Sequence, residues 1–250
     1  MNYEELIESL NELRLSGIKR EYAELARIAE KEKTSYEQYL FVLLQTELKS
    51  RLDAKVKRLI LNAKIPKEKD LATYDFKRVK GITAQEIGRL ATGQFIKSAH
   101  NLIFYGDIGV GKTHLAIGLI KELCCRKFHC LFTSTSLLIE SLLEAKKKLC
   151  LAQSWKKLDK YDLIVCDELG YIPQTKDGAD LFFQFISQRY ERRSIIITTN
   201  LTYSEWDKVF LDATTTAAAV DRIIHKSETF NIHAPSWRRE EAEKRMRKTA

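Results

Sequence analysis

One short segment constrains the fold of this chain more than any other. Residues 106–116 read GDIGVGKTHLA, and they contain the spacing glycine, four residues, glycine, lysine and threonine that is typical of phosphate-binding loops. The apolar run 101–105 before it predicts a strand, and the apolar residues after Thr113 predict a buried helix. A strand, a glycine loop and a helix in this order indicate an α/β protein that binds phosphate groups. A glycine-rich turn without a ligand is the alternative.

The residue types of the loop predict what each of them does. Glycines accept backbone angles that are closed to residues with a Cβ atom, so the loop N–H groups can point at phosphate oxygens. Lys112 would bind the β- and γ-phosphates, and the Thr113 hydroxyl would be a ligand of Mg²⁺. The residues predicted to contact the nucleotide from this loop are Gly106, Asp107, Gly109, Val110, Gly111, Lys112, Thr113 and His114.

Composition limits the class of protein. A chain of 250 residues forms one large domain or two small ones, and no apolar run approaches the roughly 20 residues of a membrane span. The acidic N-terminus MNYEELIESL does not resemble a secretory signal. Five cysteines without paired C-x-x-C spacing argue against a disulfide framework and a zinc site, and they favour a reducing cytoplasm. The net charge of +8 favours a polyanionic partner.

The pattern of apolar residues divides the chain near residue 66. Before this point apolar residues recur at helical spacing, and Pro66 is expected to end a long third helix. After about residue 98 helices alternate with candidate strands, which predicts a parallel sheet covered by helices. The candidate strands are 101–105, 128–132, 161–166 and 194–199. We therefore expect a small all-α domain at 1–66, a linker at 67–97 and an α/β domain at 98–250.

Polar residues end two of the candidate strands. YDLIVCDELGYIP places Asp167 and Glu168 at the carboxyl edge of the sheet, where open α/β folds bind ligands. Asp167 is predicted to hold Mg²⁺, and Glu168 is predicted to activate the water that attacks the γ-phosphate. Asn200 ends the run SIIITTN and would orient the same water. The alternative is that these residues only terminate strands and cap turns.

Several segments together resemble one family. NLIFYGDIGVGKTHLAIGL, YDLIVCDELGYIP, SIIITTN and AAAVDRIIHKSETFNI are similar to the IstB-like family of AAA+ ATPases. The N-terminal LNELRLSGIKREYAELARIA and YLFVLLQTELKSR resemble it as well, so the resemblance covers nearly the whole chain. Members are helper proteins encoded beside the transposase of bacterial insertion sequences, related to DnaC-type helicase loaders and to the initiator DnaA.

The resemblance implies a fold and two further site residues. The fold is a five-stranded AAA+ P-loop sheet with its last strand at 228–232, followed by a lid reduced to one helix. Arg222, in VDRIIHKS, matches the arginine finger that reaches the nucleotide of the neighbouring subunit, which implies a homo-oligomer. Arg238, in PSWRREE, matches the second sensor, an arginine that contacts the nucleotide of its own subunit. The chain departs from the family there, with Ala234 in place of a glycine and Trp237 in place of a tyrosine.

Two basic segments are candidate contacts for double-stranded DNA. The third N-terminal helix ends in a basic cluster that includes Lys55, Lys57 and Arg58, which suits phosphate neutralisation without base reading. A second basic segment ends the helix after the second strand, where initiator-type relatives line a channel, and it comprises Lys146, Lys147 and Lys148. An ordinary solvated helix face is the alternative in both cases.

Three functions are compatible with the sequence. The first is an ATP- and Mg²⁺-dependent oligomer that binds double-stranded DNA, remodels it and recruits or activates the transposase of the same element. The second is a DnaC-like loader of a replicative helicase. The third is a phosphoryl transferase for a small molecule, which leaves Asn200, Arg222 and the basic helical domain without a role. We expect the first, with no membrane partner.

Overall fold

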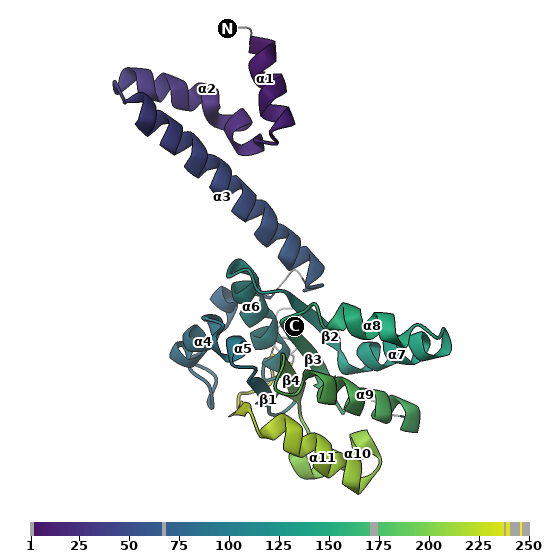
Figure 1. The fold of residues 1–250 in the computed structure, drawn as a ribbon. Coiled ribbons are helices and arrows are strands. Elements are labelled where there is room, and N and C mark those ends of the chain that lie inside the picture. The colour runs from purple at the N-terminus through teal and green to yellow at the C-terminus, as the bar shows by residue number, and fades with distance from the viewer. Residues whose placement is uncertain (1–2, 67–68, 171–174, 238, 241–245, 247–250) are drawn as a thin grey trace. The chain divides into compact units, whose positions relative to one another are not determined.

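The computed structural model describes residues 3–66, 69–170, 175–237, 239–240 and 246 (Figure 1). The chain divides into two compact units, Met1–Arg58 and Leu59–Ala250. The boundary between these units lies between Arg58 and Leu59, whereas the sequence pattern placed it near residue 66. Among the described residues, no helix combines the length and the apolar character that crossing a bilayer requires.

The described part of the first unit, residues 3–58, consists of helices and the turns between them. The helices are α1 (Tyr3–Glu12), α2 (Ser16–Lys31) and most of α3 (Tyr36–Asn62), which ends before Pro66. The buried carboxylate of Glu47 accepts hydrogen bonds from the N–H groups of Gly17 (2.7 Å) and Ile18 (3.1 Å). Because the first N–H groups of a helix have no partner within it, this contact from α3 caps α2 and fixes the two helices together.

The second unit is built on one parallel sheet. The strand order is β2-β3-β4-β1-β5. The strands are β1 (Asn101–Tyr105), β2 (Cys130–Ser134), β3 (Leu163–Leu169), β4 (Ser194–Thr199) and β5 (Ser227–Asn231). The bounds of β1 and β4 agree with the sequence prediction, and β2 and β3 begin slightly later than predicted. The predicted five-stranded parallel α/β sheet is confirmed.

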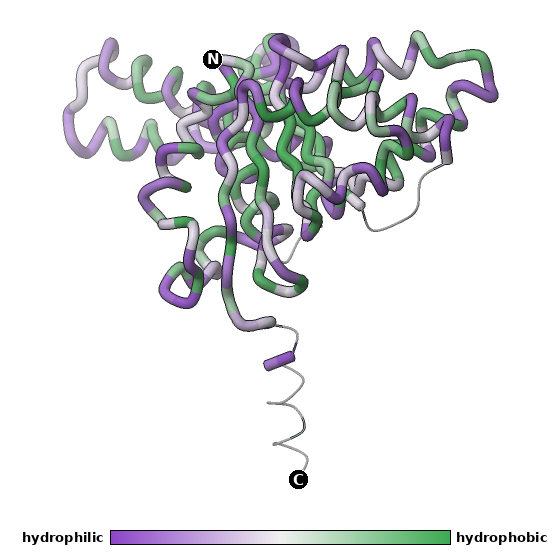
Figure 2. Tube along the Cα trace, turned by 90° about the horizontal axis from the view of Figure 1, so that it is seen from below, coloured by the Kyte–Doolittle hydropathy of each residue, from purple (hydrophilic) through white to green (hydrophobic). Residues whose placement is uncertain are grey.

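Helices cover both faces of this sheet. They are α4 (Ala84–Ala91), α5 (Gln94–Lys97), α6 (Lys112–Cys125), α7 (Thr135–Lys147), α8 (Leu151–Leu158), α9 (Lys176–Arg189), α10 (Asp207–Phe210) and α11 (Ala213–Ile224), with 3-10 turns η1 (Leu71–Thr73) and η2 (Tyr203–Glu205). Successive strand residues alternate between two hydrophobic cores, so Leu102 and Phe104 face α4 and α6 whereas Ile103 faces α7, α9 and α11. The inner strands β1, β3 and β4 are accordingly largely apolar (Figure 2), whereas the edge strand β5 is mostly polar.

The segment 67–97, which the sequence placed as a linker, belongs to the second unit where it is described. Its apolar side chains are buried in the core beside α6, including Val79, Ile82, Ile87 and Leu90. Lys80 also forms an antiparallel bridge with His233, with N–H to O distances of 2.9 and 3.0 Å. The sequence of this segment has no long run of periodically spaced apolar residues. Only its packing against α6 and β5 reveals that it is part of the folded core.

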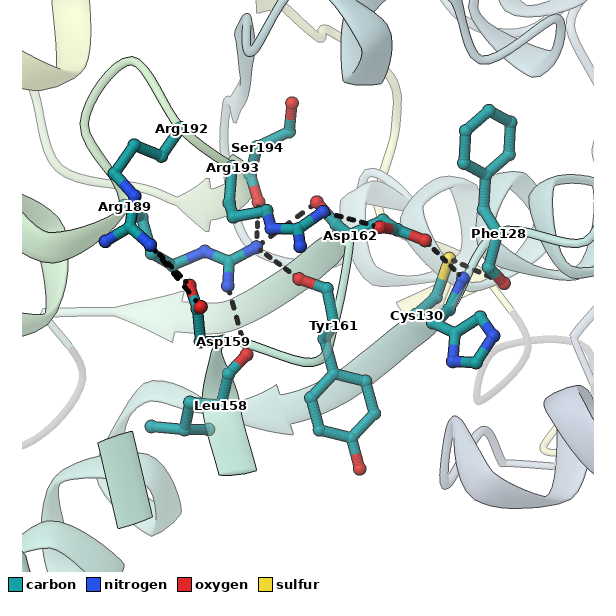
Figure 3. Close-up of polar contacts among 11 residues, drawn as sticks. Phe128, Cys130, Leu158, Asp159, Tyr161, Asp162, Arg189, Arg192, Arg193 and Ser194 are labelled. Carbon is teal, nitrogen blue, oxygen red and sulfur yellow. Dashed lines mark hydrogen bonds and ion pairs between the residues drawn. The ribbon is translucent and has the colours of Figure 1, made fainter. Parts of the chain in front are cut away.

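A buried arginine holds the amino edge of β3 and β4 (Figure 3). The Arg189 guanidinium donates to the carbonyl oxygens of Leu158 (3.3 Å), Tyr161 (3.1 Å), Asp162 (3.2 Å) and Ser194 (2.9 Å). Burial lowers the pKa of Arg189 to about 10, so the group stays charged at neutral pH. These bonds fix the turn before β3 against the start of β4, at the edge opposite the carboxyl ends of the strands.

Candidate active site

The loop between β1 and α6 has the backbone of a phosphate cradle. Gly106, Gly109 and Gly111 all have positive φ, at 149°, 85° and 100°. A Cβ atom on Gly106 would lie 2.1 Å from the Ile232 carbonyl oxygen, and one on Gly109 would lie 2.3 Å from Ser236 Oγ. Both glycines are therefore required by their backbone angle and by their neighbours.

The loop ends at the N-terminus of α6, whose first N–H groups and dipole favour an anion. Lys112 Nζ lies across the loop and donates to the carbonyl oxygens of Gly106 (2.6 Å) and Asp107 (2.7 Å). The ammonium group is thus held against the loop backbone, while the Val110 side chain is buried and Asp107 is exposed. A lysine in this position supplies a fixed positive charge for phosphate oxygens.

Asp167 lies at the carboxyl end of β3 and directly contacts the start of α6. Its Oδ1 accepts hydrogen bonds from Thr113 Oγ1 (3.0 Å) and from Thr198 Oγ1 (2.5 Å). Burial raises the pKa of this carboxyl group, although the two hydroxyl groups and the charges of Lys69 and Lys112 act in the opposite direction. Asp167 and Thr113, which are far apart in the sequence, therefore present their oxygens together.

Glu168 differs from its neighbour in both backbone and exposure. The β3–β4 register shifts between Cys166 and Leu169, and Glu168 lies within the shift with a φ of 58°. Such an angle is uncommon for a residue with a side chain, and the Glu168 N–H is held by Thr198 Oγ1 at 2.9 Å. The irregularity buries Asp167 and leaves Glu168 exposed, so the two adjacent carboxylates have different environments.

These residues surround a cavity of about 350 Å³, hereafter the nucleotide cavity. Lys112, Thr113, Glu168 and Asn200 are among the residues that line it. The remaining lining residues are Lys69, Thr73, Tyr74, Asp75, Ile108, Gly109, Gly111, His114, Thr198, Thr199 and Trp237. The structure therefore brings Glu168 and Asn200 together with part of the predicted loop, namely Gly109, Gly111, Lys112, Thr113 and His114. The predicted residues Gly106, Asp107, Val110 and Asp167 do not line the cavity.

Two distant segments complete the cavity and were missed by sequence reasoning. His114 Nε2 contacts the Asp70 carbonyl oxygen (2.7 Å) and Thr73 Oγ1 (3.2 Å), which attaches the segment around η1 to α6. The backbone N–H of Trp237 donates to the Gly109 carbonyl oxygen (3.1 Å), and the Trp237 ring packs on the Arg78 guanidinium at 4.0 Å. No local motif marked the segment around η1, because its role depends on chain segments that meet only in the fold. Trp237 lies in the segment PSWRREE that resembles the second sensor, but it was not itself predicted as a site residue.

Other predicted site residues lie outside the cavity lining. Arg222, on α11, packs its guanidinium over the Phe183 ring at 4.9 Å and donates to the Ala218 carbonyl oxygen at 3.3 Å. Arg238 lies outside the described residues, as does most of the segment predicted to form a one-helix lid. Arg222 has no contact with the nucleotide cavity of its own chain among the described residues.

The two candidate DNA segments differ in how their charges are paired. Lys146 contacts Asp177 (3.2 Å) and Lys148 contacts Glu144 (2.6 Å), whereas Lys147 is exposed at the last turn of α7. Three exposed cations of α3, Lys55, Lys57 and Arg58, form no ion pair within the described residues. In the described residues, more of the positive charge of the α3 cluster is therefore left unpaired than in the α7 segment.

Comparisons with known proteins identify the family. Residues 8–245 match the family described as IstB-like ATP binding protein. An insertion sequence protein of Sinorhizobium fredii, named for ATP binding, is 34% identical over 93% of this chain and 78% of its own length. The relative named for insertion sequence IS21 of Pseudomonas aeruginosa is 32% identical over 94% of this chain and 89% of its own.

Solved structures agree with this result at the level of the fold. The DnaC helicase loader has a TM-score of 0.54 and 24% identity, covering 66% of this chain and 96% of its own. The replication initiator DnaA, bound to AMPPCP and single-stranded DNA, has a TM-score of 0.55 and 16% identity, and the match covers 74% of this chain and 56% of the DnaA chain. The chain therefore belongs to the IstB-like family of ATP-binding proteins, and its fold is that of AAA+ ATPases.

Proposed function

We propose that this protein is the ATPase helper of an insertion sequence, which assembles on double-stranded DNA and acts with the transposase of the same element. The observation that supports the ATPase part most directly is the contact between Thr113 and Asp167 beside an exposed Glu168. It joins the phosphate loop to the carboxylate pair, of which Glu168 lines the nucleotide cavity. The family and the insertion sequence relatives support the remainder.

The residues present fit a magnesium ion. Thr113 Oγ1 and Asp167 Oδ1 lie 3.0 Å apart, and hydroxyl and carboxylate oxygens are donors that Mg²⁺ accepts. The described residues contain no cluster of three or more His, Cys, Asp or Glu side chains suited to a metal, so phosphate and water oxygens would complete the ligand set. Bound there, Mg²⁺ would neutralise charge on the phosphates of ATP.

The chain's own residues account for binding and for the attack of water. The loop N–H groups and Lys112 hold the phosphates, and Asn200 and Glu168 face the cavity where the γ-phosphate would end. In the step, the water oxygen bonds to the γ-phosphorus, the bond to the β,γ-bridging oxygen breaks, and the Glu168 carboxylate accepts the water proton. The products are ADP and phosphate.

A comparison of two variants tests this assignment. Lys112→Ala should lose tight ATP binding because the cradle loses its cation. Glu168→Gln should bind ATP and turn over very slowly, since it keeps the shape of the side chain and loses its base. Lys97→Ala and Glu140→Gln change the same residue types at exposed positions outside the cavity and are the controls. Normal turnover in Glu168→Gln would refute its catalytic role.

Arg222 would act on the nucleotide of a neighbouring subunit, in a homo-oligomer. This role is supported by its position outside its own nucleotide cavity and by the family resemblance. Arg222→Ala should bind ATP yet lose turnover by on the order of 10³-fold. Mixing it with Glu168→Gln should restore part of the activity, because a mixed interface pairs an intact Glu168 with an intact Arg222. Absence of rescue in mixtures that co-assemble would contradict the trans role.

DNA binding is assigned to the α3 cluster of Lys55, Lys57 and Arg58. Changing all three to glutamate should flatten the salt dependence of DNA binding by about 0.9 in the log–log slope for each lost phosphate contact. The same change at Lys146, Lys147 and Lys148 is the comparison, since two of those lysines are already paired with carboxylates. An unchanged slope in the first variant and a flatter one in the second would move the DNA surface to α7.

Stimulation of turnover by double-stranded DNA would separate this function from a small-molecule phosphoryl transferase. Capture of the purified transposase of the same element, compared with capture of a purified replicative helicase, would separate it from a helicase loader. Binding of the helicase alone would favour the loader.

A further inference from the structure

Tyr74 lines the nucleotide cavity and carries a buried hydroxyl group. The residue is 7% exposed, and its Oη has no hydrogen-bond partner among the described residues. A buried hydroxyl without a hydrogen-bond partner lowers the stability of the fold, and such groups are rare in native proteins. A ligand that accepts a hydrogen bond from the group is one explanation for its presence. Burial raises the pKa of Tyr74 to about 12, so the group is neutral and able to donate at physiological pH.

The hydroxyl lies beside the first turn of α6. A Cβ atom on Gly111 would be 3.0 Å from Tyr74 Cε2 and 3.3 Å from its Oη. The Tyr74 ring also meets the His114 ring edge-on, with centroids 5.3 Å apart. Gly111 and His114 share one face of the helix, three residues apart, whereas Thr113 lies on another face and contacts Asp167. Tyr74 is therefore on the side of the loop away from the catalytic carboxylates.

The position of Tyr74 is fixed by its surroundings. Its N–H donates to the Leu71 carbonyl oxygen at 3.1 Å, and its ring packs on Phe76 at 4.8 Å. The preceding Thr73 and Asp70 are bonded to His114 on α6. A donor held in place before the ligand binds loses little conformational freedom on binding, so one hydrogen bond can contribute fully to affinity.

We propose that the Tyr74 hydroxyl donates a hydrogen bond to an oxygen of the bound nucleotide on its α-phosphate and ribose side, and that it sets nucleotide affinity without affecting the chemical step. The inference rests on the proposed ATP site. The phosphate loop holds the nucleotide through backbone N–H groups of the same turn, and the γ-phosphate end lies toward Asp167 and Glu168. The contact is therefore shared by ATP and ADP and present equally before and during the reaction, which is uniform binding.

The test is Tyr74→Phe, which keeps the ring and removes only the hydroxyl. We expect the Kd values of ATP and ADP to rise by a similar factor of about ten, with kcat at saturating ATP unchanged. The nucleotide-free variant should unfold at the wild-type temperature or above it, because the unpaired group is gone. The control is Tyr190→Phe, whose hydroxyl contacts His225 Nδ1 (3.0 Å) outside the cavity and whose loss should leave both Kd values unchanged.

Unchanged Kd values in Tyr74→Phe would overturn the inference. A loss confined to ATP would overturn it as well, because the contact would then lie at the γ-phosphate. A fall in the unfolding temperature of the nucleotide-free variant would show that the hydroxyl already serves the fold. If neither the wild type nor Tyr190→Phe binds ATP, the proposed function fails too, which is distinguishable from a defect seen only in Tyr74→Phe.

Discussion

One hydroxyl group fixes both carboxylate residues at the end of β3, and Thr198→Val removes it. Thr198 is fully buried; its Oγ1 donates to Asp167 Oδ1 (2.5 Å) and accepts the Glu168 N–H (2.9 Å). Valine has nearly the same shape, so the substitution deletes these two bonds and leaves the packing in place. We expect both a loss of stability and a displacement of Glu168.

The size of the stability loss follows from the two bonds. A hydrogen bond to a charged acceptor contributes about 1.5–3 kcal/mol, and a backbone N–H left without an acceptor costs about 1–3 kcal/mol. The Glu168 N–H is only partly buried, and losses that share one atom do not add fully. The free energy of unfolding should therefore fall by about 3 kcal/mol, and turnover should fall by roughly 100-fold because Glu168 is no longer positioned.

Urea unfolding followed by tryptophan fluorescence measures this loss, because Trp155, Trp206 and Trp237 are the three tryptophans and all belong to the second unit. The matched control is Thr199→Val, whose buried hydroxyl donates to the Leu169 carbonyl oxygen (2.9 Å) and accepts the Leu201 N–H (3.0 Å). It should lose similar stability with a much smaller effect on turnover. A Thr198→Val protein within about 0.5 kcal/mol of wild type, or equal losses of turnover in both variants, would refute the reasoning.

Three further substitutions test other parts of the structure. Burial raises the folded-state pKa of Asp167 above its ordinary 3.8, so the stability contributed by its protonated form is lost as pH rises through the raised pKa. Asp167→Asn cannot titrate and should therefore gain stability relative to wild type between pH 3.5 and pH 7. Urea unfolding measures this difference, and parallel curves of stability against pH for the two proteins would contradict it. Arg189→Leu leaves the carbonyl oxygens in Figure 3 without their donor and should lower the free energy of unfolding by about 3–5 kcal/mol. Arg192→Leu loses an exposed ion pair with Asp159 and an exposed bond to the Gln188 carbonyl oxygen (3.4 Å), and it should stay within about 1 kcal/mol of wild type. Burial raises the pKa of Glu47, but hydrogen bonds from Arg51, Ile18 and Gly17 outweigh it and lower the pKa below its ordinary 4.5. The stability contributed by the ionised Glu47 is therefore present above pH 4.5 and is lost as pH falls through the lowered pKa. The loss of helix on acidification, followed by circular dichroism, should be weaker in Glu47→Gln.

The sequence by itself determined the features that depend on residues close together in the chain. The phosphate loop was predictable because its glycines, Lys112 and Thr113 are neighbours whose backbone angles and chemistry are set locally. The strands were predictable because both faces of a parallel sheet are buried, which requires continuous apolar runs such as 101–105 and 194–199. The position of Asp167 and Glu168 after such a run placed them at the carboxyl edge. Their assigned roles stay predictions.

Only the tertiary structure decided how distant segments complete the site. Thr198 reads as one more strand residue, yet it bonds both residues of the carboxylate pair because β4 lies beside β3. Tyr74 and Trp237 come from opposite ends of the second unit and meet at the phosphate loop. The segment placed as a linker is part of the core for the same reason. Contacts between remote segments depend on strand order and helix packing, and no local periodicity encodes either.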